Sequence, residues 1–262
     1  FGSYKIFDQD YSVAEIEEIM ISNSTLPFDD YLKSRKLDFF VNVFYNDAVF
    51  DDLFILFKKI NVKIWDWIYF LFKNYKKFEF KNLVNDFIDE TKNELSSEKK
   101  LKDFVSKPKN IQRYINGEIG NNLMFKYKSL SLTNFSHNMF LMAENLTNEF
   151  LKENNIKNLK IKKLSKEIIR FTKLKIVDIF SSKKELRGIF EFNILDLKNI
   201  NNLKNINNFS NKNKYTFLFK NINQNDIDKY LQLFGSDTKG LTRILSRVYL
   251  KKFFRNPEIL QW

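Results

Sequence analysis

The stretch EEIMISNSTLPFDDYLKSRKLDFFVNVFYN, from Glu17 to Asn46, changes abruptly from an extended run to a helix. Pro27 fits the first turn of a helix, because the N–H group it lacks has no helical partner there. Asp29 and Asp30 follow, and their charges favour the positive end of the helix dipole. Apolar residues then recur at helical spacing and predict one buried face. The residues of that face are Phe28, Leu32, Phe39, Phe40 and Val43.

Helical spacing continues through most of the chain. Asp51 and Asp52 open a second predicted helix, and the apolar run around Trp65 and Trp67 predicts a third at the centre of a helical array. The segment NGEIGNN, from Asn116 to Asn122, predicts a loop. Further helices are predicted over about 79–95, from Ser97 to a stop at Pro108, over about 134–154, around Leu164 to Phe171, and from about Asn225 to an end at Gly235.

The period changes to two in the last third of the chain. Leu186–Leu195 and Tyr215–Lys220 alternate between apolar and polar residues, as strands do. We assign Ile176–Phe180 to a third strand and Thr242–Leu250 to another, with a helix as the alternative for the latter. Asn199–Lys214 is rich in asparagine and predicts a solvated loop.

These patterns predict an α+β fold that is predominantly α, a helical array followed by a small antiparallel sheet near the C-terminus. We expect two units. Residues 1–172 form a helical subdomain with an extended lead-in, in which Glu18–Ser22 either pairs as a short strand or crosses the surface. Residues 173–262 form a small α+β subdomain packed on it.

Composition excludes several kinds of chemistry within this chain. There is no cysteine, so disulfides, cysteine-ligated metals and thiol nucleophiles are excluded, and His137 is the only histidine. No glycine-rich phosphate loop and no nucleophile elbow occurs. The most apolar run, Ile64–Phe72, contains Asp66 and is far shorter than the roughly 20 residues of a membrane span. We expect no catalytic set, no metal site and no membrane span here, and a cytoplasmic location.

Charge is distributed unevenly. Residues 1–95 have a net charge of −5, with 12 basic and 17 acidic side chains, whereas residues 96–262 reach +17. A basic half can bind a polyanion such as nucleic acid or an anionic glycan, although most lysine-rich runs are simply solvated. The binding face would consist of Lys160, Lys162, Lys163, Lys166, Arg170 and Lys173.

The opening stretch resembles the region that follows the catalytic barrel in cobalamin-binding radical SAM proteins. In that region an acidic extended run leads to a Ser/Thr-Thr-Leu/Met step, two acids, an aromatic residue and a helix. INGEIGNN (Ile115–Asn122), the helix from Asn134, GIFEFNIL and the terminal FGSDTKGLTRILSRVY follow in the same order. The matching positions in the opening stretch are Glu15, Glu18, Ser24, Thr25, Leu26, Asp29, Asp30 and Tyr31.

The resemblance implies an accessory role. The family's C-x-x-x-C-x-x-C cluster motif and its cobalamin-ligand motif are both absent, so no catalytic residue is carried over. The sequence begins at Phe1, and we expect a fragment or a processed chain whose upstream domain binds S-adenosylmethionine, an iron–sulfur cluster and, in this family, cobalamin. This chain would cover the barrel and help to dock a small-molecule or glycan substrate or a partner. Its contacts with the missing domain would come from Tyr31, Arg35 and Asp38, for which an ordinary surface ion pair is the alternative.

An independent hydrolase is a third interpretation. His137 would act as general base beside Ser136, with Glu144 and Glu149 as further acid–base groups. Adjacent residues on a helix point about 100° apart, which argues against a Ser136–His137 pair.

Overall fold

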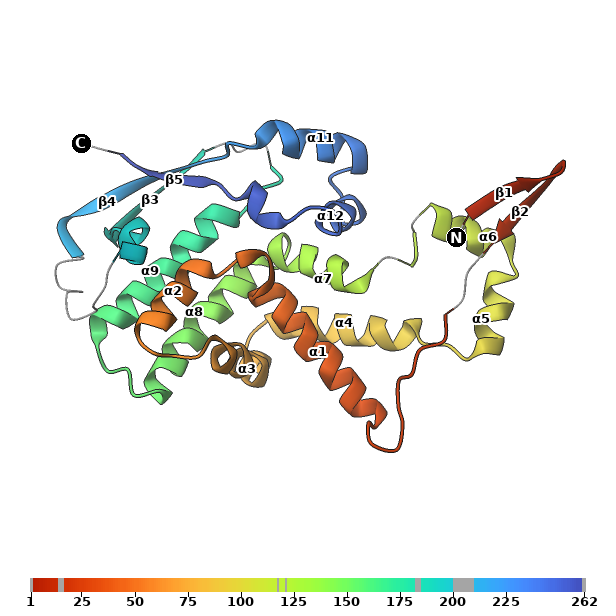
Figure 1. The fold of residues 1–262 in the computed structure, drawn as a ribbon, viewed down its shortest axis with the longest axis horizontal. Helices are drawn as coiled ribbons and strands as arrows, with labels where there is room; N and C mark the ends of the chain where they lie inside the picture. The colour runs from red at the N-terminus through yellow and green to blue at the C-terminus, as the bar shows by residue number, and fades with distance from the viewer. Residues whose placement is uncertain are drawn as a thin grey trace.

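The computed structural model of the 262-residue chain describes residues 2–13, 17–116, 118–120, 122–181, 185–199 and 210–260. A helical array is followed by a three-stranded antiparallel sheet, which confirms the predicted α+β architecture (Figure 1). The α-helices are α1 (Phe28–Phe44), α2 (Asp51–Lys59), α3 (Ile64–Asn74), α4 (Phe80–Glu94), α5 (Glu98–Val105), α6 (Pro108–Ile115), α7 (Leu123–Leu132), α8 (Ser136–Glu153), α9 (Leu159–Ile176), α11 (Gln224–Phe234) and α12 (Thr238–Leu245).

Short 3₁₀ helices and strands complete the described elements. The 3₁₀ helices are η1 (Asn46–Ala48), η2 (Tyr75–Lys77), η3 (Ile194–Asn199) and η5 (Leu250–Phe253). The strands are β1 (Gly2–Ile6), β2 (Gln9–Val13), β3 (Glu185–Phe192), β4 (Ser210–Lys220) and β5 (Asn256–Ile259).

Most of the predicted helices are confirmed within a few residues. α1 begins directly after Pro27 with both aspartates in its first turn, and its predicted face is buried except for Phe28. α4 buries the predicted apolar stripe, and α11 ends at Gly235, whose φ of 89° suits glycine. α3 differs in part, since Trp67 is fully buried but Trp65 is half exposed.

Two local predictions are wrong. Ile176–Phe180 is not a strand, because α9 continues to Ile176 and turns follow it. Thr242–Leu250 is not a strand either, since α12 runs to Leu245 and η5 starts at Leu250. Pro108 does end the preceding helix, but it also occupies the first turn of α6. The sequence did not predict α6 or α7.

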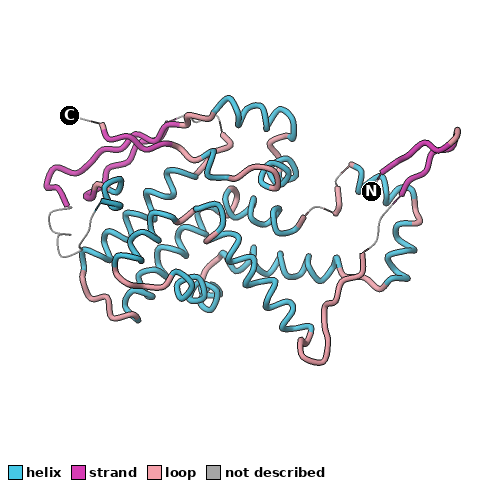
Figure 2. The backbone as a smooth tube through the Cα atoms, viewed as in Figure 1, coloured by secondary structure: helices cyan, strands magenta, loops and turns pink. Residues whose placement is uncertain are grey.

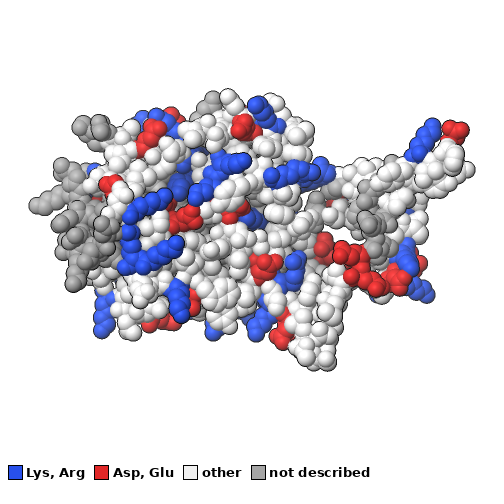
Figure 3. All heavy atoms as spheres, in the orientation of Figure 1, with Lys and Arg blue, Asp and Glu red and all other residues white. Residues whose placement is uncertain are grey.

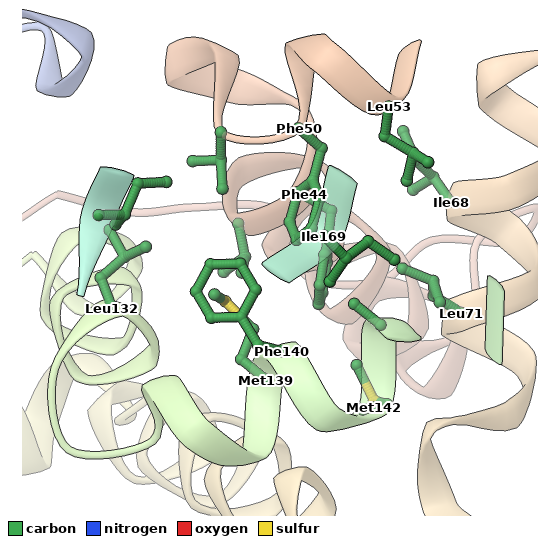
Figure 4. Close-up of a cluster of buried hydrophobic side chains, with 14 of the residues drawn as sticks. Phe44, Phe50, Leu53, Ile68, Leu71, Leu132, Met139, Phe140, Met142 and Ile169 are labelled. Carbon is green, nitrogen blue, oxygen red and sulfur yellow. The ribbon is translucent and has the colours of Figure 1, made fainter. Parts of the chain in front are cut away.

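The core is built around one indole ring. Trp67 on α3 meets Phe44, Phe50, Phe54 and Phe57 edge-on, with ring centroids 5.4–6.0 Å apart. Its N–H donates to Thr147 Oγ1 on α8 at 2.9 Å. Met139 and Met142 of α8 pack in the same interior as Phe44 and Phe50 (Figure 4), so they fill the core.

The C-terminal sheet has the order β3-β4-β5 and is antiparallel throughout. α9 lies against it, and Phe171 meets Phe190, Phe217 and Phe219 edge-on. The pairing of β3 with β4 shifts between Phe190 and Phe192. Glu167 of α9 accepts the N–H groups of Glu191 and Phe192 there, at 2.9 and 3.2 Å, and so satisfies backbone donors at the irregularity.

The first two strands form a projecting hairpin, which we call the N-terminal arm together with the extended run 17–22. The hairpin of the arm lies at one end of the molecule, beside α6 and away from the bundle (Figure 2). Glu17–Ser22 forms no strand and crosses the surface. An Asx turn then redirects the chain into α1, since Asn23 Oδ1 accepts the N–H groups of Thr25 and Leu26, each at 2.8 Å.

The predicted boundary between residues 172 and 173 lies inside α9. One cluster of buried side chains extends from Phe39 to Phe254, on both sides of that boundary. Most of the asparagine-rich segment lies outside the described residues, and its last residues, Ser210–Lys214, belong to β4. Within the described ranges no helix has the length and apolarity to cross a membrane.

Candidate functional site

The three residues predicted on the first helix do not form one cluster. Arg35 and Asp38 lie 3.8 Å apart on α1, and Tyr31 instead stacks on Phe28. The Arg35 guanidinium lies 5.7 Å from the centroid of the Phe87 ring on α4. Arg35 therefore faces α4, whereas Asp38 remains exposed.

The predicted basic face of α9 is largely occupied by contacts within the molecule. Lys163 pairs with Glu191 at 2.6 Å and Lys166 with Glu144 at 2.9 Å. Arg170 donates to the Ile189 carbonyl, and the Lys173 ammonium lies 3.5 Å from His137 Nδ1. Among the described residues, only Lys160 and Lys162 of this face lack an ion pair or side-chain hydrogen bond.

The positions of Ser136 and His137 do not support the hydrolase interpretation. Ser136 is buried without a hydrogen-bond partner for its hydroxyl, whereas His137 is exposed and faces Lys173. Glu144 and Glu149 each pair with a lysine, Lys166 and Lys77 respectively. No described residue therefore activates the Ser136 hydroxyl.

A charged groove lies around α2 and combines two adjoining hollows, of about 800 and 380 Å³. We call it the lysine groove. Both hollows share Asp52, Lys175, Lys198 and Lys251, so they form one continuous surface. Figure 3 shows basic side chains gathered around a few acidic ones on the face where α2 lies. The charged residues of the lysine groove are Asp47, Asp51, Asp52, Lys58, Lys128, Lys175, Lys198, Lys251, Lys252 and Arg255.

Three Lys–Asp pairs set the geometry of the groove. Lys128 of α7 is only 3% exposed and pairs with Asp47 of η1. Lys175 near the end of α9 pairs with Asp52 at 2.8 Å, and Lys251 of η5 pairs with Asp51 at 2.7 Å. The hydrogen bond to Asp51 raises the pKa of the Lys251 ammonium, which keeps its charge at neutral pH.

The groove brings together residues that are far apart in the sequence. Asp51 and Asp52 were recognised only as the start of a helix, and Lys128 belongs to a helix that the sequence did not predict. The sequence signal for this groove is the pair of acids at the start of α2. It does not show which lysines form ion pairs with them.

A separate hollow, which we call the acidic cavity, measures about 640 Å³ and lies between α4, α5 and α6. Its apolar wall includes Leu101, Phe104 and Tyr114. At its α4 side, Glu90 accepts hydrogen bonds from Lys126 at 2.5 Å and from the Tyr127 hydroxyl at 2.7 Å. Loss of hydration and this contact raise the pKa of Tyr127, so its proton stays on the phenol. The acids of the cavity are Glu17, Glu90, Glu94 and Glu118.

Glu94 is the perturbed acid of this cavity. Partial loss of hydration and the charge of Glu90 raise its pKa to about 6, although Arg35 and Lys126 oppose the shift. Its carboxyl group can therefore exchange a proton close to neutral pH. A cavity with an apolar wall and a few convergent polar groups is the usual form of a small-molecule site.

Among the described residues, neither the lysine groove nor the acidic cavity contains a recognisable metal centre. Within the described ranges, no group of three or more His, Asp or Glu side chains is placed to hold a metal ion. The lysine groove offers ammonium groups to an anion, and the acidic cavity offers carboxylates to a polar or cationic group. Comparison with known proteins adds no assignment, since no family model, curated protein or solved structure matches the chain.

Proposed function

We propose that this chain is a non-catalytic accessory domain that docks through its N-terminal arm onto the catalytic domain of a radical SAM enzyme. That domain would lie upstream in the same polypeptide. The observation that carries the proposal is the apolar surface of the arm. Phe7 is 94% and Met20 71% exposed. The other large apolar side chains exposed in the arm are Tyr4, Ile6, Tyr11, Val13 and Ile19.

The exposed apolar side chains of the arm are poorly explained if no partner surface covers them. A two-stranded hairpin is marginally stable alone in water, because it lacks a second layer to bury its side chains. Every described side chain from Tyr4 to Met20 is exposed, so the bundle does not supply that layer. A partner surface would bury these residues, and contiguous exposed apolar residues commonly mark such interfaces.

The resemblance to radical SAM proteins supports the choice of partner. Ser24, Thr25 and Leu26, which carry that resemblance, lie at the Asx turn where the arm joins α1. The catalytic domain would supply the S-adenosylmethionine site, the iron–sulfur cluster and any cobalamin, since this chain has no cysteine. The acidic cavity includes Glu17 of the arm, so a small-molecule or glycan substrate could reach it from the docked domain.

Hydroxyl-radical footprinting of the complete gene product tests the docking. Phe7, Tyr11 and Met20 should oxidise several-fold more slowly in the complete protein than in residues 1–262 alone. Trp65, half exposed on α3, serves as the control and should react equally in both. Equal oxidation of the arm in both samples would refute the docking.

A second measurement tests the identity of the partner. The complete protein, reconstituted with iron and sulfide and reduced, should cleave S-adenosylmethionine to 5′-deoxyadenosine. Residues 1–262 treated in the same way should not. A gene product that lacks this activity would rule out a radical SAM parent, whatever the footprint shows.

A further inference from the structure

We propose that the lysine groove binds a ligand that carries several phosphates next to a flat ring, such as a nucleoside triphosphate or a single-stranded nucleic acid. The proposal places anion binding at the groove rather than on the predicted face of α9. It is independent of the docking function, because the groove lies around α2 and not on the arm.

The first argument is unbalanced positive charge. Six lysines and Arg255 line the groove against three aspartates, and each aspartate already pairs with one lysine. Lys58, Lys198 and Lys252 have no ion-pair or hydrogen-bond partner for their ammonium groups among the described residues. Ammonium groups without a carboxylate partner are available to phosphate oxygens.

The second argument is that the paired lysines are held in place. The aspartates fix Lys128, Lys175 and Lys251, and Lys175 also lies 5.8 Å from the centroid of the Phe254 ring. An ammonium group fixed before binding loses less conformational entropy when an anion arrives. Because each carboxylate is neutralised by its own lysine, the three aspartates repel an incoming phosphate only weakly.

The third argument is the shape and chemistry of the walls. The larger hollow, about 800 Å³, is within the usual size of a small-molecule site. Tyr45 and Tyr249 both line it, and each is 50% exposed. Exposed aromatic rings beside basic side chains are the combination by which proteins bind single strands, since each stacked base contributes about 1–3 kcal/mol.

Fluorescence anisotropy with a labelled single-stranded oligonucleotide of about ten nucleotides tests the site. ATP and tripolyphosphate serve as competitors and distinguish a nucleic acid from a free nucleotide or a phosphate chain. The double substitution Lys198→Glu/Lys252→Glu should weaken binding of the oligonucleotide or of ATP about tenfold or more. For the oligonucleotide, the slope of log affinity against log salt should fall in magnitude by about 1.4, because two phosphate contacts are lost.

The matched control is Lys160→Glu/Lys162→Glu at the start of α9. It makes the same change of charge on lysines that also lack ion-pair partners among the described residues. It should leave the affinity almost unchanged, and circular dichroism checks that both variants fold. An equal loss in both variants would mean general attraction to a basic protein, and would overturn the site.

Ring stacking has its own test. Tyr45→Ala and Tyr249→Ala should each weaken ATP and the oligonucleotide several-fold, with tripolyphosphate binding unchanged. If all three ligands bind to these variants as tightly as to the native protein, the tyrosines do not stack on the ring and that part of the proposal fails. No measurable binding of any of the three at low salt overturns the proposal as a whole.

Discussion

The buried Trp67 has a single polar atom, and its hydrogen bond depends on one hydroxyl group. The indole N–H donates to Thr147 Oγ1, and the Thr147 hydroxyl donates to the Ala143 carbonyl at 2.6 Å. Both side chains are fully buried, so water cannot replace the partner. An unsatisfied buried donor destabilises a protein by about 1–3 kcal/mol.

Thr147→Val should therefore lower the free energy of unfolding by about 1–3 kcal/mol, because it keeps the shape and removes the hydroxyl. Urea unfolding followed by tryptophan fluorescence measures the loss. Thr147→Ser is the control, since it keeps the hydroxyl and loses one methyl group, for a smaller loss of about 1 kcal/mol. A valine variant as stable as the native chain would show that the bond contributes nothing.

Glu94 makes stability depend on pH in a defined direction. Its pKa is raised to about 6 in the folded state, so the folded protein holds this proton more tightly than the unfolded chain, whose ordinary value is 4.5. The protonated form favours folding, and this contribution is complete below pH 4.5 and is lost as the pH rises through about 6. Because Glu94 is exposed to solvent on one side, we expect less than about 1 kcal/mol.

Glu94→Gln should remove that contribution. The difference in unfolding free energy between variant and native protein should change by up to about 1 kcal/mol between pH 4.5 and 7, with the variant gaining relative stability at higher pH. Glu153→Gln, on the exposed last turn of α8, is the comparison for loss of a surface charge. A difference that stays constant across this range would contradict the assignment.

The candidate sites could not be predicted from the sequence, because they depend on distant segments. Asp47, Lys128, Lys175 and Lys251 each come from a different helical element, and no spacing rule connects them. The basic face of α9 is a local pattern, and the sequence did not show that Glu144 of α8 and Glu191 of β3 pair with two of its lysines. The sequence shows where lysines gather on a helix, but it does not show which carboxylates pair with them in the fold.

Among the elements, α9 has an unusual C-terminal cap. Arg255 is 1% exposed and donates to the carbonyls of Leu174, Val177 and Asp178, at 3.3, 2.5 and 3.2 Å. Burial lowers the pKa of its guanidinium, but arginine remains charged at any ordinary pH. A cation at the negative end of the helix dipole also stabilises the helix.

Arg255→Met should lower the free energy of unfolding by about 3 kcal/mol, because it leaves buried carbonyls at the end of α9 without a donor. Arg255→Lys should cost less but remain destabilised, since one ammonium group cannot reproduce the guanidinium geometry. Denaturant titration measures both variants. Arg187→Met, on the exposed side of β3, should change stability by less than about 0.5 kcal/mol, and equal effects at the two positions would argue against the cap.

Elements were predictable where one face is apolar and the other polar. α4 shows that pattern and was found, whereas α7 was missed because its polar residues Lys128, Ser129 and Ser131 are buried along with its leucines. α12 was assigned to a strand, yet Asp237 caps it by accepting the Gly240 N–H at 2.8 Å. A side chain at Gly240 would collide with the carbonyl groups of Phe234 and Gly235, a tertiary constraint that no local pattern shows.

At the scale of the whole molecule, the hairpin of the arm projects from the body that carries the core (Figure 2). The buried cluster contains no residue before Phe39. Of the two strands of the arm, β2 packs against α6. Because burial of apolar surface is the main source of stability, a segment that buries little should contribute little. The residues of the arm can therefore be suited to a partner surface without affecting the folding of the bundle.

Deletion of residues 1–22 should therefore leave the thermal midpoint of the body within about 2–4 °C of the full chain, which corresponds to less than about 1 kcal/mol for a protein of this size. Differential scanning calorimetry measures it, and Trp67→Ala in the full chain should lower the midpoint far more, because a large core side chain typically contributes 3–5 kcal/mol. The same deletion should prevent docking, since it removes Phe7, Tyr11 and Met20 together. If the deletion instead lowers the midpoint as much as Trp67→Ala, the arm is part of the body's own structure, and its exposed residues cannot be explained as a surface for a partner.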